Sequence, residues 1–242
     1  MQRVDAPEIL DSDACSPAEA QAVLAVIGSI NRRFGGVATT QRMVGRVAQA
    51  TGMNRLSLLE VGAGSGELPN IVQRNMAQHG IALDVTLLDL SSSHLPGDYS
   101  SSGNRSVAGN ALALPFGNDT FDLVSCNLFA HHLAPQQLET FFKEAMRVTR
   151  RAVLMNDLVR DPLHLALVYA SFPLMRNRIA WLDGLTSVRR AYVPEEIRGI
   201  LVSAFSPAIL AQTEISRNFL YRMGVIVWKT RGGADGVSRM RV

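Results

Sequence analysis

Three glycines in five residues follow an apolar run in the segment LLEVGAGSGE, at positions 58–67. Gly62, Gly64 and Gly66 would leave the backbone bare between a buried strand and a helix, so that a ligand can approach the main chain and its free amide groups. Dinucleotide-binding loops follow the pattern G-x-G-x-x-G, whereas Glu67 stands here at the position of the last glycine. The spacing therefore argues against a dinucleotide, and a tight strand-to-helix turn without a ligand is the structural alternative.

An acidic residue, Asp89, lies at the end of the next apolar run, LLDLS. If this run is a second parallel strand, Asp89 stands at the carboxyl edge of the sheet beside the glycine loop, where a carboxylate can accept two hydrogen bonds from a ribose diol. The segment GNALALPFGNDTFDLV at 109–124 then supplies a polar residue, a turn and another buried strand. Together these features predict a site for a ribose-containing ligand at one sheet edge.

These segments resemble the class I S-adenosylmethionine-dependent methyltransferases, specifically the small-molecule branch that includes the ubiquinone and menaquinone biosynthesis enzymes. The resemblance covers residues 56–157. Four segments carry it: residues 60–66, Asp89, NALALPFGNDTFDLV at 110–124, and NLFAHHL at 127–133. The resemblance implies S-adenosyl-L-methionine as the cofactor and an enzyme that methylates a small molecule.

The resemblance also assigns roles to individual residues. Glu60 would hold the glycine loop and the amino group of the methionyl moiety, Asp89 the ribose, and Asn127 would line the methionine pocket. Asn110 stands where many relatives have an aspartate that contacts the adenine amino group, and its side-chain carbonyl can still accept that hydrogen bond. The full set of expected cofactor-binding residues is Glu60, Gly62, Ala63, Gly64, Gly66, Asp89, Leu90, Asn110, Ala111, Asn127 and Arg32.

Candidate catalytic residues follow the fourth and fifth predicted strands. Of the paired histidines, His132 is the favoured candidate to face the transferred methyl group and His131 is the alternative. Asp157 is a candidate general base or a candidate contact that holds the acceptor. The simpler alternative is that its carboxylate only caps the segment that follows. The other histidines have no metal-ligand spacing, so no metal site is expected.

Apolar runs alternate with amphipathic segments from Leu56 onward, which is typical of β-α-β units around a parallel sheet. The predicted fold is an α/β, Rossmann-like seven-stranded sheet, mostly parallel with an antiparallel last strand, with helices on both faces and an N-terminal helical lid. Strands are expected at 56–61, 84–89, 105–109, 121–126 and 151–156, and helical segments over 17–50, broken by the FGG at 34–36, and around PQQLETFFKEAMRV at 135–148. Two last strands, at 208–215 and 220–229, must pair antiparallel because only SRN separates them.

We expect five parts along the chain: an N-terminal helical cap at 1–50, a cofactor-binding core at 51–157, an acceptor-pocket insertion at 158–193, the rest of the core sheet at 194–230, and a flexible tail at 231–242. The insertion is rich in apolar side chains that would line an aromatic or polyketide-like acceptor's pocket, or pack a lid helix. These are Leu163, Leu165, Leu167, Val168, Tyr169, Phe172, Leu174 and Met175, interrupted by Arg176 and Arg178.

The composition excludes several classes of protein. Apolar residues make up 47% of the 242 residues and the net charge is only +3, without a basic run, so nucleic acid is not an expected partner. The longest apolar stretch, about 12 residues near HLALVYASFPLM, is short of the ~20 that span a bilayer. The acidic N-terminal residues do not fit a signal peptide, and Cys15 and Cys126 lack zinc spacing, so a cytoplasmic location is expected.

The favoured function is methylation of a phenol or enol oxygen on a small aromatic acceptor by in-line transfer, since alignment supplies more of the barrier reduction than acid-base help. Ring C-methylation of a quinone-type lipid is the alternative within this class. A nicotinamide-dependent oxidoreductase is disfavoured by the glycine spacing and the lack of a Tyr-x-x-x-Lys pair, and a non-catalytic module that only binds cofactor is a third reading. A homo-oligomer is compatible with the sequence.

Overall fold

The computed structural model describes residues 1–10, 16–96, 105–173, 177–218 and 221–230. The expected flexible tail at 231–242 and three residues of the expected acceptor insertion, at 174–176, lie outside these ranges.

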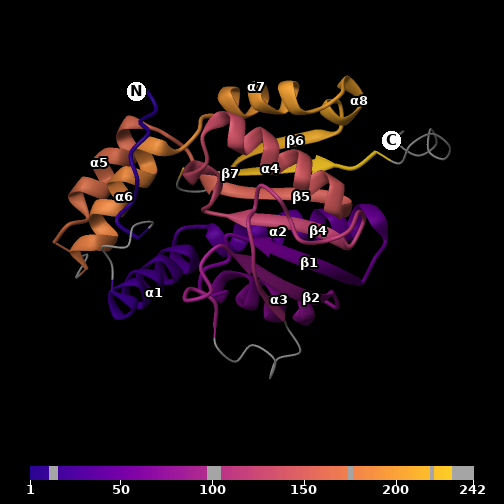
Figure 1. Ribbon diagram of the computed structural model, residues 1–242, viewed down its shortest axis with the longest axis horizontal. Coiled ribbons are helices and arrows are strands. Elements are labelled where there is room, and N and C mark those ends of the chain that lie inside the picture. The colour runs from indigo at the N-terminus through magenta and orange to yellow at the C-terminus, as the bar shows by residue number, and fades with distance from the viewer. Residues whose placement is uncertain (11–15, 97–104, 174–176, 219–220, 231–242) are drawn as a thin grey trace.

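A seven-stranded sheet forms the centre of the molecule, in the order β3-β2-β1-β4-β5-β7-β6 (Figure 1). The first five strands in the chain pair in parallel, while β7 pairs antiparallel with both β5 and β6. This topology confirms the predicted fold class. The strands are β1 Arg55–Val61, β2 Ala82–Asp89, β3 Arg105–Ala108, β4 Phe121–Asn127, β5 Thr149–Leu158, β6 Thr213–Asn218 and β7 Arg222–Trp228.

Helices cover both faces of the sheet, and strand β1 shows why. Leu59 and Val61 belong to a core cluster with α4 (Pro135–Val148) and α7 (Pro194–Ala204), whereas Leu58 belongs to a second cluster with α2 (Gly36–Thr51) and α3 (Glu67–Gln78). Successive side chains of a strand point to opposite faces, so a strand buried on both sides is largely apolar, and Glu60 is the buried exception in β1.

Three further helices gather at one end of the sheet: α1 (Pro17–Arg33), α5 (Pro162–Ala170) and α6 (Arg178–Arg190) (Figure 1). Each begins at a polar cap: the hydroxyl of Ser16 accepts from the amide of Glu19, Asp161 accepts from Leu163, and Asn177 accepts from Ala180. These caps satisfy amide groups that the first helical turn leaves without partners. The chain then crosses from α1 to α2 at Gly35, with φ of 78°, as the FGG break predicts.

The end of the sheet differs from the sequence-based expectation. The run at 208–215 is not one strand, because Pro207 starts the short helix α8 (Pro207–Leu210) and β6 begins only at Thr213. The residues SRN at 216–218, expected to form the connection, extend β6 instead. The predicted antiparallel pairing of the two last strands is correct.

No helix in the described ranges combines the length and apolar content needed to cross a bilayer.

The packing of α4 can be tested by truncating a fully buried ring. We expect Phe142→Ala to lower the free energy of unfolding by about 3 to 5 kcal/mol, because it leaves a cavity between the helix and the sheet. Lys143→Ala, at the exposed neighbouring position, should change it by less than about 0.5 kcal/mol. Chemical denaturation of both variants measures the difference, and equal stabilities would contradict the described core.

Candidate functional site

A cavity of about 930 Å³ lies at the carboxyl edge of the parallel strands. Its walls come from the loops after β1, β2 and β4, from α1 and α6, and from residues near the chain's N-terminus. The structure brings most of the sequence-predicted site residues into this wall: Glu60, Gly62, Ala63, Gly64, Asp89, Leu90, Asn110, Ala111, Asn127, His131 and His132. Gly66, Arg32 and Asp157 do not line it.

The glycine loop is built for close approach to the backbone. Gly62 has φ of +67° and a Cβ there would lie 2.4 Å from the ring of Phe129, while Gly64 has φ of +52°. Side chains other than glycine rarely adopt this left-handed region, so both positions require glycine for conformational reasons, and Gly62 for steric reasons too. Gly66, with φ of +69°, is instead the N-cap residue of α3.

Asp89 is held beside the glycine loop by hydrogen bonds. Its carboxylate accepts from the amide of Gly64 at 2.9 Å and from the amide of Ser91 at 3.1 Å, and His94 Nδ1 lies 3.3 Å away. Burial alone would raise the pKa of Asp89, but the bonds from His94, Gly64 and Ser91 hold it below its ordinary value. The carboxylate therefore stays ionised at neutral pH and ready to accept further hydrogen bonds.

A chain of buried, hydrogen-bonded side chains ends at Glu60. Asn156 Nδ2 donates to Thr40 Oγ1 at 2.9 Å, Thr40 Oγ1 donates to Asn127 Oδ1 at 2.6 Å, and Asn127 Nδ2 donates to Glu60 Oε1 at 2.8 Å. Asn156 also donates to the carbonyl of Gly36. These hydrogen bonds fix the Asn127 amide so that its carbonyl faces α2 and its NH₂ group faces Glu60.

Glu60 is left with one carboxylate oxygen unsatisfied. Oε2 is buried and has no hydrogen-bond partner among the described residues. Burial raises the pKa of Glu60 to about 7, against the opposing hydrogen bonds from Asn127 and Ser125. A buried acceptor without a partner is costly, so this oxygen marks a position where a ligand's donor or cation would be stabilised.

The two residues on the adenine side of the predicted site also lie in the cavity wall. Asn110 Oδ1 accepts from the amide of Leu112 at 2.8 Å, and Ala111 is buried beside it. The bond from Leu112 occupies one lone pair of the Asn110 carbonyl and fixes its direction.

Arg32 does not line the cavity. Its guanidinium pairs with the carboxylate of Glu67 at the start of α3, and 44% of the side chain is exposed. Its helical neighbour Asn31 lines the cavity instead. The resemblance implies that Asn31 and Arg32 belong to an N-terminal lid that closes over the methionine carboxylate, Arg32 by charge pairing, and this contact stays a prediction.

The acceptor end of the cavity contains the paired histidines. His131 is buried, its Nδ1 lies 2.7 Å from Asp157 Oδ1, and its Nε2 lies 3.3 Å from Glu8 Oε1. Burial would lower the pKa of His131, but the flanking carboxylates of Asp157 and Glu8 raise it to about 10. Asp157 lies behind His131 and orients it, as its second oxygen accepts from the backbone amide of His131.

Sequence reasoning did not single out two charged residues of this wall, Glu8 and Arg222. Arg222 is buried at the start of β7, where Nη2 donates to Asn31 Oδ1 at 2.9 Å and Nη1 has no hydrogen-bond partner among the described residues. Burial lowers the pKa of Arg222 to about 10, which the charge of Asp157 opposes. The sequence feature that could have identified Arg222 is its position as the first residue of an otherwise apolar strand, RMGVIVW.

The apolar wall comes mainly from α1 and α6, not from α5. Leu24 and Ile27 of α1 and Val188 of α6 line the cavity, and of the apolar residues expected there from 158–193 only Val168 does. Leu163, Leu167, Tyr169 and Phe172 are exposed to 45–59%. Leu174 and Met175 lie outside the described residues.

Comparisons with known proteins agree with this geometry. Residues 59–154, which contain β2 to β4, the last three residues of β1 and the first six of β5, match the family model described as a methyltransferase domain. No curated protein matches the chain significantly.

Solved structures share the fold at low sequence identity. A SAM-dependent methyltransferase from Aquifex aeolicus is 14% identical, with a TM-score of 0.56, over 89% of this chain and 100% of that one. Human N-acetylserotonin methyltransferase in complex with SAM is 14% identical, with a TM-score of 0.61, over 89% and 57%. An O-methyltransferase family 2 protein from Planctomyces limnophilus DSM 3776, in complex with apigenin, is 15% identical, with a TM-score of 0.59, over 91% and 64%. The chain thus spans less than two thirds of the last two proteins.

The unsatisfied Glu60 can be tested through the pH dependence of stability. Because its pKa is raised in the folded protein, the stability contributed by protonated Glu60 is present below pH 4.5 and is lost as pH rises to about 7. The difference in unfolding free energy between wild type and Glu60→Gln should fall by about 3 kcal/mol over this window. Denaturant titrations of both proteins at several pH values measure it, and a constant difference would show that Glu60 ionises normally.

Proposed function

We propose that the protein is an S-adenosylmethionine-dependent methyltransferase, since residues 59–154 match the model of a methyltransferase domain, and that it methylates a phenol or enol oxygen on a small, largely apolar acceptor. The observation that carries the proposal is the single cavity, which has the predicted cofactor residues at one end and apolar helices with buried charged groups at the other. A volume of about 930 Å³ lies at the upper end of the range for small-molecule sites, so it suits a cofactor and an acceptor together.

The residues present fit S-adenosylmethionine. We assign the cofactor's ammonium group to the unsatisfied Oε2 of Glu60, its ribose to Asp89, and close backbone contact to Gly62 and Gly64. Asn110 and Ala111 would flank the adenine. When bound, the cofactor supplies an electrophilic methyl group on a sulfonium centre. The protein's task is then to orient the acceptor and to exclude water.

The acceptor is assigned to the other end of the cavity, where parts of the segments 1–50 and 158–193 form the wall. Val168 of α5 and Val188 of α6 offer apolar surface for a ring. Arg222 adds a buried cation with an unpaired Nη1. Asp157 is a counter-charge for Arg222, but a buried N–H group without a hydrogen-bond partner is costly, and an oxygen anion on the acceptor would offset that cost by accepting from Nη1.

This cation is the observation that favours oxygen over carbon as the methylated atom, because a phenolate or enolate carries its charge largely on oxygen. Ring C-methylation of a quinone-type acceptor, as in the ubiquinone and menaquinone branch, is the second candidate, since a phenolate also activates ring carbons. The structural neighbours include proteins described as O-methyltransferases and as carbon methyltransferases, so they support a small-molecule acceptor and leave both atoms open. We further propose a cytoplasmic location, in keeping with the free thiol of buried Cys126.

Cofactor binding can be tested with two aspartates of the same strand. Asp89→Ala should weaken binding of S-adenosylhomocysteine by about 10- to 100-fold, because a charge-assisted hydrogen bond to the ribose is lost. Asp84→Ala is the matched control, since Asp84 is exposed and its carboxylate pairs with Arg55 at the surface. Isothermal titration calorimetry gives both affinities. Equal affinities for the two variants, or preferential binding of NAD by the wild type, would overturn the assigned site.

The acceptor assignment can be tested by methyl transfer from labelled cofactor to phenols and to matched aromatic compounds without a hydroxyl group. We expect transfer only to the phenols, and Arg222→Gln should raise the acceptor's KM by about tenfold or more through loss of the charge. S-adenosylhomocysteine affinity of this variant should stay within about twofold, which also reports correct folding. Arg217→Gln on the neighbouring strand, exposed at the surface, is the control. Cofactor binding without any transfer would favour a non-catalytic module.

A further inference from the structure

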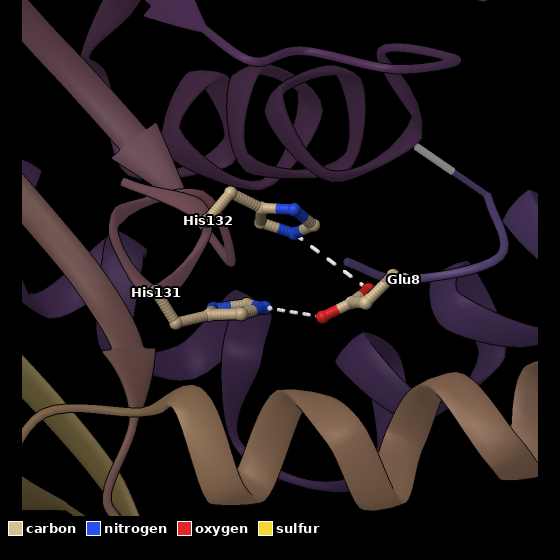
Figure 2. A group of neighbouring side chains, drawn as sticks. All are labelled: Glu8, His131 and His132. Atoms are coloured by element: carbon tan, nitrogen blue, oxygen red, sulfur yellow. Dashed lines mark ion pairs between the residues drawn. The ribbon is translucent and has the colours of Figure 1, made fainter. Parts of the chain in front are cut away.

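Three potential metal ligands meet at the acceptor end of the cavity. The carboxylate of Glu8 and the side-chain nitrogens of His131 and His132 lie within 4.8 Å of one another, although Glu8 is more than a hundred residues away in sequence. Figure 2 shows both rings turned toward the Glu8 carboxylate, which lies opposite them. We propose that these three side chains form a binding site for a divalent transition-metal ion of the Zn²⁺ type.

The spacing of the three groups fits a shared ion better than mutual hydrogen bonds. His131 Nε2 lies 3.3 Å from Glu8 Oε1, and His132 Nε2 lies 3.8 Å from Glu8 Oε2. The second distance is too long for a hydrogen bond and the first is at the long end. Neighbouring ligands of a tetrahedral ion with bonds of about 2.0 to 2.2 Å are themselves about 3.3 to 3.6 Å apart. Small shifts of these side chains would therefore give three bonds of normal length.

Asp157 prepares His131 for this role. The carboxylate lies 2.7 Å from His131 Nδ1 and also accepts from the backbone amide of the same residue. This contact places the Nδ1 proton toward Asp157 and turns Nε2 toward Glu8. Between these two carboxylates the ring is an imidazolium, so an ion that binds Nε2 replaces the proton there, which is released to solvent. A carboxylate behind a histidine is the usual support of a metal ligand, because it fixes the tautomer and the ring orientation.

Glu8 is held in place by bonds from α6. Ser187 donates its hydroxyl to Glu8 Oε1 at 2.7 Å, and the backbone amides of Ile9 and Leu10 donate to the carboxylate of Asp183 at 2.7 and 3.0 Å. Glu8 is only 5% exposed and His131 2%. The donors are thus fixed before any ion binds, which lowers the entropic cost of binding.

The ligand set indicates the type of ion and its use. Two imidazoles and one carboxylate suit borderline first-row ions, and three protein ligands leave a coordination position open. All three residues line the cavity, so this position faces the space assigned to the acceptor. An acceptor oxygen bound there would be held and polarised by the ion. This use of the ion rests on the proposed function, whereas the site itself does not.

The site can be tested on the full-length protein without cofactor or acceptor. After removal of metal with a chelator, titration calorimetry with Zn²⁺ should show one equivalent bound, and Co²⁺ should give the visible absorption of a four-coordinate ion. Glu8→Gln and His132→Gln should each weaken Zn²⁺ binding by at least about 100-fold, and Asp157→Asn by about 10- to 100-fold. His79→Gln, which changes an exposed histidine of the surface, should leave binding unchanged.

Binding of S-adenosylhomocysteine provides the check on folding for each variant. If Glu8→Gln does not bind S-adenosylhomocysteine, the Zn²⁺ affinity of His132→Gln tests the proposal instead. His132 is less buried than Glu8, so its substitution disturbs folding less. The proposal is overturned if the wild type does not bind one equivalent of Zn²⁺ or if folded His132→Gln binds it as tightly. Failure of methyl transfer with intact Zn²⁺ binding would count against the proposed function and not against the metal site.

Discussion

The carboxyl edge of the sheet depends on one directional chain of buried hydrogen bonds, from Asn156 through Thr40 and Asn127 to Glu60. It joins β5, α2, β4 and β1, and each of its links holds two of these four elements together. Unpaired polar groups are costly inside a protein, and the chain therefore fixes α2 against the sheet as well as the orientation of each amide. The chain leaves two buried oxygens without a hydrogen-bond partner among the described residues, Asn156 Oδ1 at its start and Glu60 Oε2 at its end, and Glu60 lines the cavity beside the glycine loop.

Charge is distributed unevenly along the cavity. At the cofactor end, Asp89 is kept ionised by surrounding donors, while Glu60 has a raised pKa because it has too few. At the other end, His131 lies between two carboxylates and Arg222 is buried nearby. Such opposite environments for titratable groups within one cavity are typical of functional sites, whereas structural ion pairs are usually satisfied on both sides.

Sequence reasoning located the residues whose positions follow from local patterns. Gly62, Gly64, Asp89 and Asn127 lie at strand ends, and parallel strands bring their carboxyl ends together, so a correct strand prediction places them. It could not place Glu8 or α6, because their contacts with the site span more than a hundred residues of sequence. Adjacent helical residues point about 100° apart, so Asn31 lines the cavity while Arg32 pairs with Glu67, and the role of Arg32 in cofactor binding stays a prediction.

The contacts of residues 1–10 bear on the order in which the molecule assembles. Arg3 donates to the carbonyls of His131, Leu133 and Arg190, and Glu8 accepts from Ser187, at sequence separations of 128 to 187. Closing loops of this length is entropically unfavourable until both ends are already structured, so these bonds form late in folding. The sheet and its glycine loop can thus become native first, and the wall that carries Glu8 is the last piece to dock. The expected kinetic signature is a folding intermediate. In it the sheet and the glycine loop already bind a nucleoside, while the cavity wall that contains Glu8 has not yet docked.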